Sequence, residues 1–182
     1  MRTKLLFSFL VLFSVHASAQ NFVPADDGSN VHFTIKNFGF NTGGDFKGLK
    51  GTIFFNPSFP STATFSVNIS SATINTDNET RDKDLREELY FHVEKFPEIS
   101  LVSTKIDKTN KTDDGFYFFT GNLTIKGVTK PVSFPFKAEK VLNNYLFTGE
   151  FSINRLDFGV GEKSTVLSQK VIVNLKVLAK TK

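Results

Sequence analysis

Short segments in which apolar and polar residues alternate recur along this 182-residue chain and leave few folds open to it. In one of them, Phe65, Val67 and Ile69 are separated by Ser66 and Asn68. Successive side chains of a β-strand point to opposite faces, so this pattern predicts a strand with one dry face and one wet face. The same parity predicts strands in seven further segments: residues 31–35, 51–55, 99–101, 119–125, 132–136, 147–153 and 171–177.

The short connections between these segments predict that neighbouring strands run antiparallel. Asp114-Gly115 and Asn143-Asn144 suit tight hairpins, because Asn, Asp and Gly tolerate positive φ. Lys126-Gly127 separates two strands by too few residues for a parallel crossover. Eight antiparallel strands with one apolar face form either a closed barrel or a two-sheet sandwich. A barrel of eight strands is just wide enough inside to be filled by side chains or to hold one small ligand.

Phenylalanine supplies much of the apolar surface: it accounts for 22 of the 182 residues, whereas tryptophan and cysteine are absent. This composition favours a barrel that encloses something apolar. Gly51, Gly121 and Gly149 fall on the inward face, where a packed core usually has bulk. Two interpretations follow. The glycines leave space for a dry cavity, or they coil the strands and relieve crowding.

One segment, residues 78–90, predicts a helix. Thr76 and Glu79 have the spacing of a capping box, and Leu85 and Leu89 form a narrow apolar stripe among charged residues. A helix this polar packs either as a lid beside a barrel mouth or as an ordinary surface helix within a long loop.

Residues 1–19 have the features of a signal peptide. Arg2 and Lys4 precede an apolar run, and Ala17-Ser18-Ala19 provides small residues for cleavage before Gln20. The alternative is an N-terminal membrane anchor, but the run is shorter than the roughly 20 residues that a span requires. The protein is therefore expected to be exported, and these residues leave its destination, the extracellular space included, open.

Cleavage would leave residues 20–182 as a single domain. Loss of Arg2 and Lys4 lowers the formal charge from +4 to +2, which argues against a nucleic-acid partner. Without cysteine the mature chain has neither disulfides nor an acylated thiol, so its core must stabilise it and no stable membrane anchor is expected. The sequence leaves open whether the protein forms a homodimer.

The chain resembles the YceI-like family of exported lipid- or polyisoprenoid-binding proteins. The resemblance extends from about Asn30 to Leu178 and depends on the order and spacing of several motifs. These are residues 31–35 (VHFTI), 44–46 leading to 51–57, Thr76 with Asn78, Arg81-Asp82 and Leu85, Phe96-Pro97 with Ser103-Thr104, residues 121–132 (GNLTIKGVTKPV), and residues 153–159 (INRLDFG).

The resemblance implies an all-β, lipocalin-like, eight-stranded antiparallel barrel with one helix near its mouth. It also implies a bacterial periplasmic protein that holds a polyisoprenoid, quinone-like or fatty-acyl molecule. Together with the inward parity, it predicts an apolar ligand cavity lined by Phe33, Ile35, Phe46, Ile53, Phe65, Val67, Phe119, Leu123, Phe134, Phe136, Phe151 and Val173.

Arg81 and Arg155 are the candidate headgroup contacts, because an arginine fork can bind a phosphate or carboxylate through two hydrogen bonds. The alternative role is structural for both residues. Arg81 would then pair with a neighbouring acid, and Arg155 would pair with Asp157 to pin a strand end.

The sequence favours a binding protein without catalysis, metal or cofactor other than the bound lipid or isoprenoid. It contains no nucleophile elbow, zinc-protease motif or phosphate loop, and His32 and His92 are isolated. Transport and storage of the ligand both remain open. Two alternatives are an exported interaction module with a solid core and a barrel enzyme acting on an isoprenoid or lipid.

Overall fold

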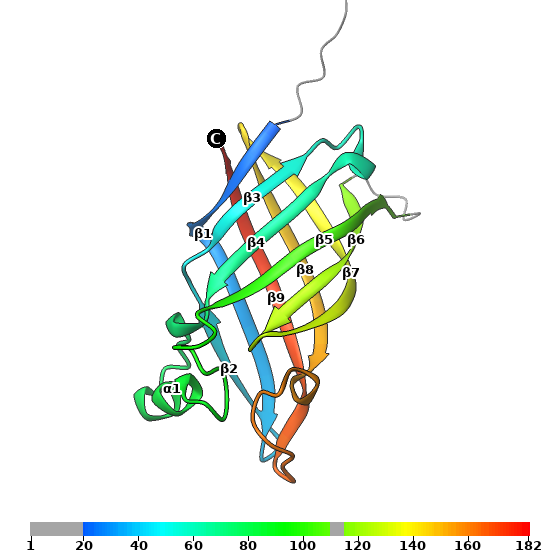
Figure 1. The fold of residues 1–182 in the computed structure, drawn as a ribbon. Coiled ribbons are helices and arrows are strands. Elements are labelled where there is room, and N and C mark those ends of the chain that lie inside the picture. Colours follow the sequence, from blue (N-terminus) through cyan, green and yellow to red (C-terminus); the bar gives the residue numbers. More distant parts are fainter. Residues whose placement is uncertain (1–19, 110–114) are drawn as a thin grey trace, which may run out of the picture.

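The computed structural model of the protein describes residues 20–109 and 115–182, which form a single antiparallel sheet curled into a barrel (Figure 1). The predicted signal peptide and Asp114 lie outside the described residues. The strands are β1 (Gln20–Asn37), β2 (Phe40–Phe46), β3 (Lys50–Phe55), β4 (Thr64–Ser70), β5 (Glu98–Lys108), β6 (Phe116–Ile125), β7 (Val128–Val141), β8 (Asn144–Asn154) and β9 (Leu167–Thr181).

Pairing of β1 with β9 closes the sheet, and this confirms the predicted eight-stranded antiparallel barrel. On its other edge, β1 pairs with β3 over residues 20–22 and with β2 over residues 31–37, so β2 and β3 share one position in the ring. Each of the eight predicted segments lies within an observed strand. The additional strand β2 was not predicted, because its sequence contains adjacent glycines and shows no alternation.

The end of the barrel near the C-terminus is filled by aromatic side chains. The Phe55 ring meets Tyr117, Tyr145 and Phe147 edge-on, with centroids 5.1–5.3 Å apart. Phe22 packs against Tyr145 in the same way at 5.3 Å, and all of these rings are buried. Edge-to-face pairs add stabilisation beyond the burial of apolar area. The interior is therefore solid at this end.

Tyr145 makes this closed end sensitive to alkali. Burial raises the pKa of Tyr145 above its ordinary value of 10.0, so the unfolded chain releases this proton at lower pH than the folded chain does. The contribution of the Tyr145 hydroxyl to the free energy of unfolding is fully present below pH 10 and is lost as the pH rises further. We expect Tyr145→Phe to flatten the fall of the urea midpoint above pH 10. An identical pH dependence in variant and parent would contradict this assignment.

The inward glycines relieve crowding. A Cβ atom at Gly51 would collide with the backbone oxygen of Ser66, and one at Gly121 with that of Val102. Gly121 faces a register shift in β5 between Ser103 and Lys105, where the strands coil. The cavity-making interpretation is therefore wrong for these two positions. Gly149 borders the cavity described below, although a Cβ there would lie 3.3 Å from Phe134 and Phe136.

The helix α1 (Glu79–Arg86) lies beside β2, at the end of the barrel away from the C-terminus (Figure 1). It is shorter than predicted, and its N-cap is Asn78, whose side chain accepts a hydrogen bond from the Arg81 amide. The predicted capping box is wrong because Thr76 is engaged with Asp82 instead. Leu89 lies beyond the helix and is exposed. Short 3₁₀ turns cover Pro60–Thr62, Ser71–Thr73 and Arg155–Phe158.

Two of the predicted hairpins have tight turns among the described residues. Lys126 and Gly127 both have positive φ, 51° and 73°, as the two-residue turn requires. At the β7–β8 turn the positive φ falls on Leu142, at 56°, and Asn144 already belongs to β8, so this turn lies one residue earlier than predicted. Within the part of the chain that the structure describes, no helix is long and apolar enough to cross a bilayer.

Candidate functional site

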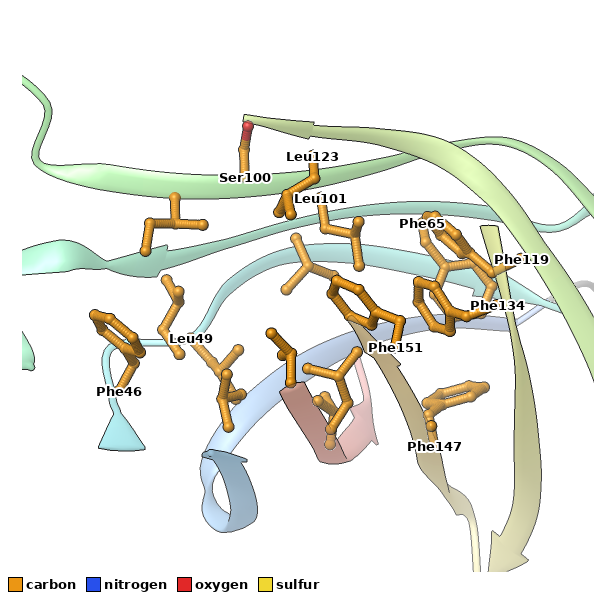
Figure 2. A pocket seen from close by; sticks show the side chains of 18 of the residues that line it. Phe46, Leu49, Phe65, Ser100, Leu101, Phe119, Leu123, Phe134, Phe147 and Phe151 are labelled. Carbon is orange, nitrogen blue, oxygen red and sulfur yellow. The ribbon is translucent and has the colours of Figure 1, made fainter. Parts of the chain in front are cut away.

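Beyond the aromatic plug the barrel is hollow. A cavity of about 170 Å³ is bordered by inward residues of all the barrel strands, and its surface is almost entirely carbon (Figure 2). We call it the inner cavity. Phe33, Val67, Phe151 and Val173 point inward and border this cavity yet retain partial exposure, whereas the rings of the plug are buried.

One wall of the inner cavity is a stack of phenylalanine rings. Phe134 lies between Phe119 and Phe151, with centroid distances of 4.9 and 4.5 Å and interplanar angles of 21° and 15°. The three residues come from β6, β7 and β8 (Figure 2). Parallel stacking of this kind makes a continuous apolar surface without polar atoms.

A second pocket of about 460 Å³ opens beside α1 and is called the outer pocket. Phe33, Phe91, Ile125 and Ile153 border both spaces, so the two share a common wall. The outer pocket adds polar side chains to this apolar base. They include Asn37, Thr42, Thr76, Asn78, Thr80, Arg81, Asp84 and Arg155. The barrel thus changes from almost wholly apolar inside to partly polar at its mouth.

Arg155 borders the outer pocket from the 3₁₀ turn Arg155–Phe158 and is only 4% exposed. Its guanidinium donates hydrogen bonds to the carbonyl oxygens of Ser168 (3.0 Å), Val160 (2.8 Å) and Glu162 (2.7 Å). Burial lowers the pKa of Arg155 from its ordinary value, and the group stays charged at physiological pH. Its partners are therefore three carbonyls, and the predicted pairing of Arg155 with Asp157 is wrong.

Arg81 borders the same pocket from α1. Its Nε donates to the Thr76 hydroxyl at 2.7 Å and its Nη2 to the Thr76 carbonyl at 2.6 Å. The same hydroxyl donates to the buried Asp82 carboxylate at 2.5 Å. Arg81 therefore reaches an acid only through Thr76. Among residues 20–109 and 115–182, its Nη1 has no hydrogen-bond partner in the protein, and the group remains available at the mouth.

The structure brings the sequence-predicted site residues together. The predicted apolar residues border the inner cavity except for Ile35, which borders the outer pocket with Arg81 and Arg155. Sequence reasoning missed several further lining residues. Leu101 and Leu175 lie at inward positions of predicted strands and could have been found from the alternation. Leu49, Tyr90 and Phe91 lie in connections where no periodic signal exists.

These features define a class of protein, a closed antiparallel barrel with an apolar interior that opens toward a polar mouth. The chain belongs to the family of the YceI-like domain, which it matches over residues 23–179. The UPF0312 protein ECA1782 of Pectobacterium atrosepticum is 33% identical over 148 residues, a match that covers 78% of this chain and 75% of the relative. The chain spans about half, 52%, of the length of several other curated relatives.

Two solved structures have the same fold. BcnA of Burkholderia cenocepacia superposes with a TM-score of 0.80 at 22% identity, over 86% of this chain and 99% of that protein. A polyisoprenoid binding domain from Saccharophagus degradans superposes with a TM-score of 0.70 at 12% identity, over 91% of this chain and all (100%) of that domain. At these identities the likeness establishes the architecture.

Proposed function

We propose that this protein binds one long-chain amphiphile and carries or stores it in an exported, periplasmic compartment. The tail would occupy the inner cavity, and the headgroup would lie in the outer pocket. The observation that carries this proposal is the shared wall between a dry interior and a polar mouth at one end of a barrel that is plugged at the other.

Cavity size favours a ligand that extends through both spaces. An apolar cavity of about 150 Å³ holds benzene, so the inner cavity of about 170 Å³ alone would hold only a short piece of a chain. The outer pocket brings the site into the range of roughly 300–1,000 Å³ typical of ligand sites. The Saccharophagus neighbour is a polyisoprenoid binding domain, which supports an isoprenoid here, with quinone-like and fatty-acyl chains as alternatives.

The energetics suit a binding protein whose selectivity depends on the headgroup. Burial of a methylene contributes about 0.8 kcal/mol, so a sixteen-carbon chain contributes on the order of 12 kcal/mol before costs. Association and chain ordering cost roughly 4–15 kcal/mol. Burial of the tail and the cost of association are therefore of similar size, so a few polar contacts to the headgroup can decide whether binding is weak or strong. Arg81 and the buried charge of Arg155 favour an anionic headgroup such as a phosphate or a carboxylate.

We further propose that binding is not coupled to a reaction. The surface that would surround the tail is almost entirely carbon, and most ionisable side chains that border the two spaces lie at the mouth, where the headgroup would lie. The hollow interior argues against the alternative of an interaction module with a solid core.

Native mass spectrometry of the purified mature protein, followed by solvent extraction, tests the proposal. We expect one equivalent of an isoprenoid or lipid to copurify with the protein or to be taken up from a total lipid extract. A bare mass after incubation with that extract would refute ligand binding. Turnover of the extracted compound on prolonged incubation would instead identify an enzyme.

A further inference from the structure

The turn between β1 and β2 holds two phenylalanine rings in water. Phe38 is 71% exposed and Phe40 is 77% exposed. Val166, in the loop that precedes β9, is also exposed, and its carbonyl accepts a hydrogen bond from the Phe38 amide at 2.9 Å. We call Phe38, Phe40 and Val166 the apolar tip. Large exposed apolar groups gathered in one place mark interaction sites.

The backbone conformation at position 38 does not require a phenylalanine side chain. Phe38 and Gly39 form a two-residue turn with φ of 50° and 81°. Asn or Gly is favoured at the first position, and a bulky residue there is a conformational outlier. At the equivalent turn, Lys126 has the same strained φ but its Nζ donates to the Gly159 carbonyl at 2.7 Å. The ring of Phe38 lies in water, as does the side chain of Leu142 at φ of 56°, so what distinguishes the tip is the gathering of Phe38, Phe40 and Val166.

The apolar tip lies at the rim of the outer pocket. Asn37 and Thr42, on either side of the turn, line that pocket, and so does Leu167, which follows Val166. Figure 1 shows the β1–β2 turn and the loop before β9 side by side at the end of the barrel away from the C-terminus. A partner that covers the tip would therefore also face the opening of the site.

The charges along the chain near the tip are mostly positive. Lys36, Lys163 and Lys170 lie within four residues of a tip residue, together with a single acid, Glu162. Each of these side chains is exposed. Exposed rings with lysines nearby along the chain match the interfacial layer of an anionic bilayer, where rings enter the boundary of headgroups and acyl chains while lysines remain among the phosphates.

We propose that the apolar tip docks on the surface of an anionic phospholipid membrane. Phe38 and Phe40 enter the interfacial layer and hold the mouth of the outer pocket against the lipid. The benefit of docking rests on the proposed function, because docking would let an amphiphile pass between bilayer and barrel without crossing water. The docking itself requires no ligand.

Flotation of the mature protein with vesicles of phosphatidylcholine and phosphatidylglycerol tests the docking. We expect the parent protein to float with the vesicles and Phe38→Asn/Phe40→Thr to remain below, with partitioning weaker by about tenfold for each ring. Leu142→Asn is the matched control. Leu142 is 86% exposed with φ of 56°, but it lies in the β7–β8 turn at the other end of β9, near Thr181. Its variant is expected to float like the parent.

Two further readouts separate docking from ligand binding. In native mass spectra the tip variant should take up an extracted lipid from detergent as the parent does, because Phe38 and Phe40 do not border either pocket. Its rate of lipid uptake from vesicles should fall with its flotation. If the parent does not float, or the tip variant floats equally well, the docking proposal is wrong whether or not ligand binds. A concentration-dependent dimer that only the tip variant abolishes would assign the tip to a second copy of the chain and would also overturn it.

Discussion

Val173→Phe is expected to weaken the binding of a long-chain isoprenoid about 100-fold while the barrel remains folded. Val173 points inward from β9 and borders the inner cavity. The larger side chain adds about four carbons and would displace about four methylenes of the ligand, a loss of roughly 3 kcal/mol. Because the ring enters a hollow instead of a packed core, the cost of overpacking should be small. Titration with an isoprenoid probe measures the affinity, and thermal unfolding checks the fold.

Ile172→Phe is the control for this experiment. Ile172 is the preceding residue of β9 and pairs with Ser152 and Thr34, so its side chain points away from the cavity. Its variant adds about three carbons outside the barrel, and its affinity should match that of the parent. If Val173→Phe remains folded and binds as tightly as Ile172→Phe, the inner cavity is not the ligand site.

The strand positions and the lining residues could be predicted because both depend on local geometry. The pleat fixes which side chains share a face, so residues such as Phe65 and Val67 could be placed on the inside from sequence alone. Strand β2 could not be found in this way, because it forms where the long strand β1 extends beyond β3 and offers a free edge. The middle of β2 is Asn, Thr and two glycines, so the strand has no apolar period.

Other features depend on distances that no sequence pattern contains. Whether the barrel is filled or hollow depends on where the rings of Phe55 and Tyr145 meet across it, and of the inward glycines only Gly149 borders the hollow. Asn78 caps α1 because Thr76 is occupied by Asp82, a contact that spacing alone did not reveal. The partners of Arg155 are backbone carbonyls, which every residue possesses, so they could not be singled out in the sequence.

Arg155→Met is expected to lower the free energy of unfolding by about 3 kcal/mol. The guanidinium holds together the turn at Val160, the loop at Glu162 and the start of β9 at Ser168. Methionine fills a similar volume but donates nothing, so three carbonyls lose a charged donor at about 1 kcal/mol or more each. For a domain of this size the melting temperature should fall by about 10 °C. Arg155→Lys keeps the charge without the planar fork and should recover only part of this loss.

Arg86→Met separates the structural role of Arg155 from a role in headgroup binding. Arg86 also clamps backbone carbonyls, those of Ala72 and Ile74 at 2.9 Å, but it is partly exposed and does not border the outer pocket. Its loss should cost about 1 kcal/mol and leave affinity unchanged. If Arg155→Met weakens binding of a phosphate-headed isoprenoid but not of the uncharged alcohol, the buried charge serves the headgroup. If both variants bind the phosphate-headed isoprenoid and the alcohol as tightly as the parent does, Arg155 has only its structural role. Only a charge that faces the mouth can distinguish the two headgroups.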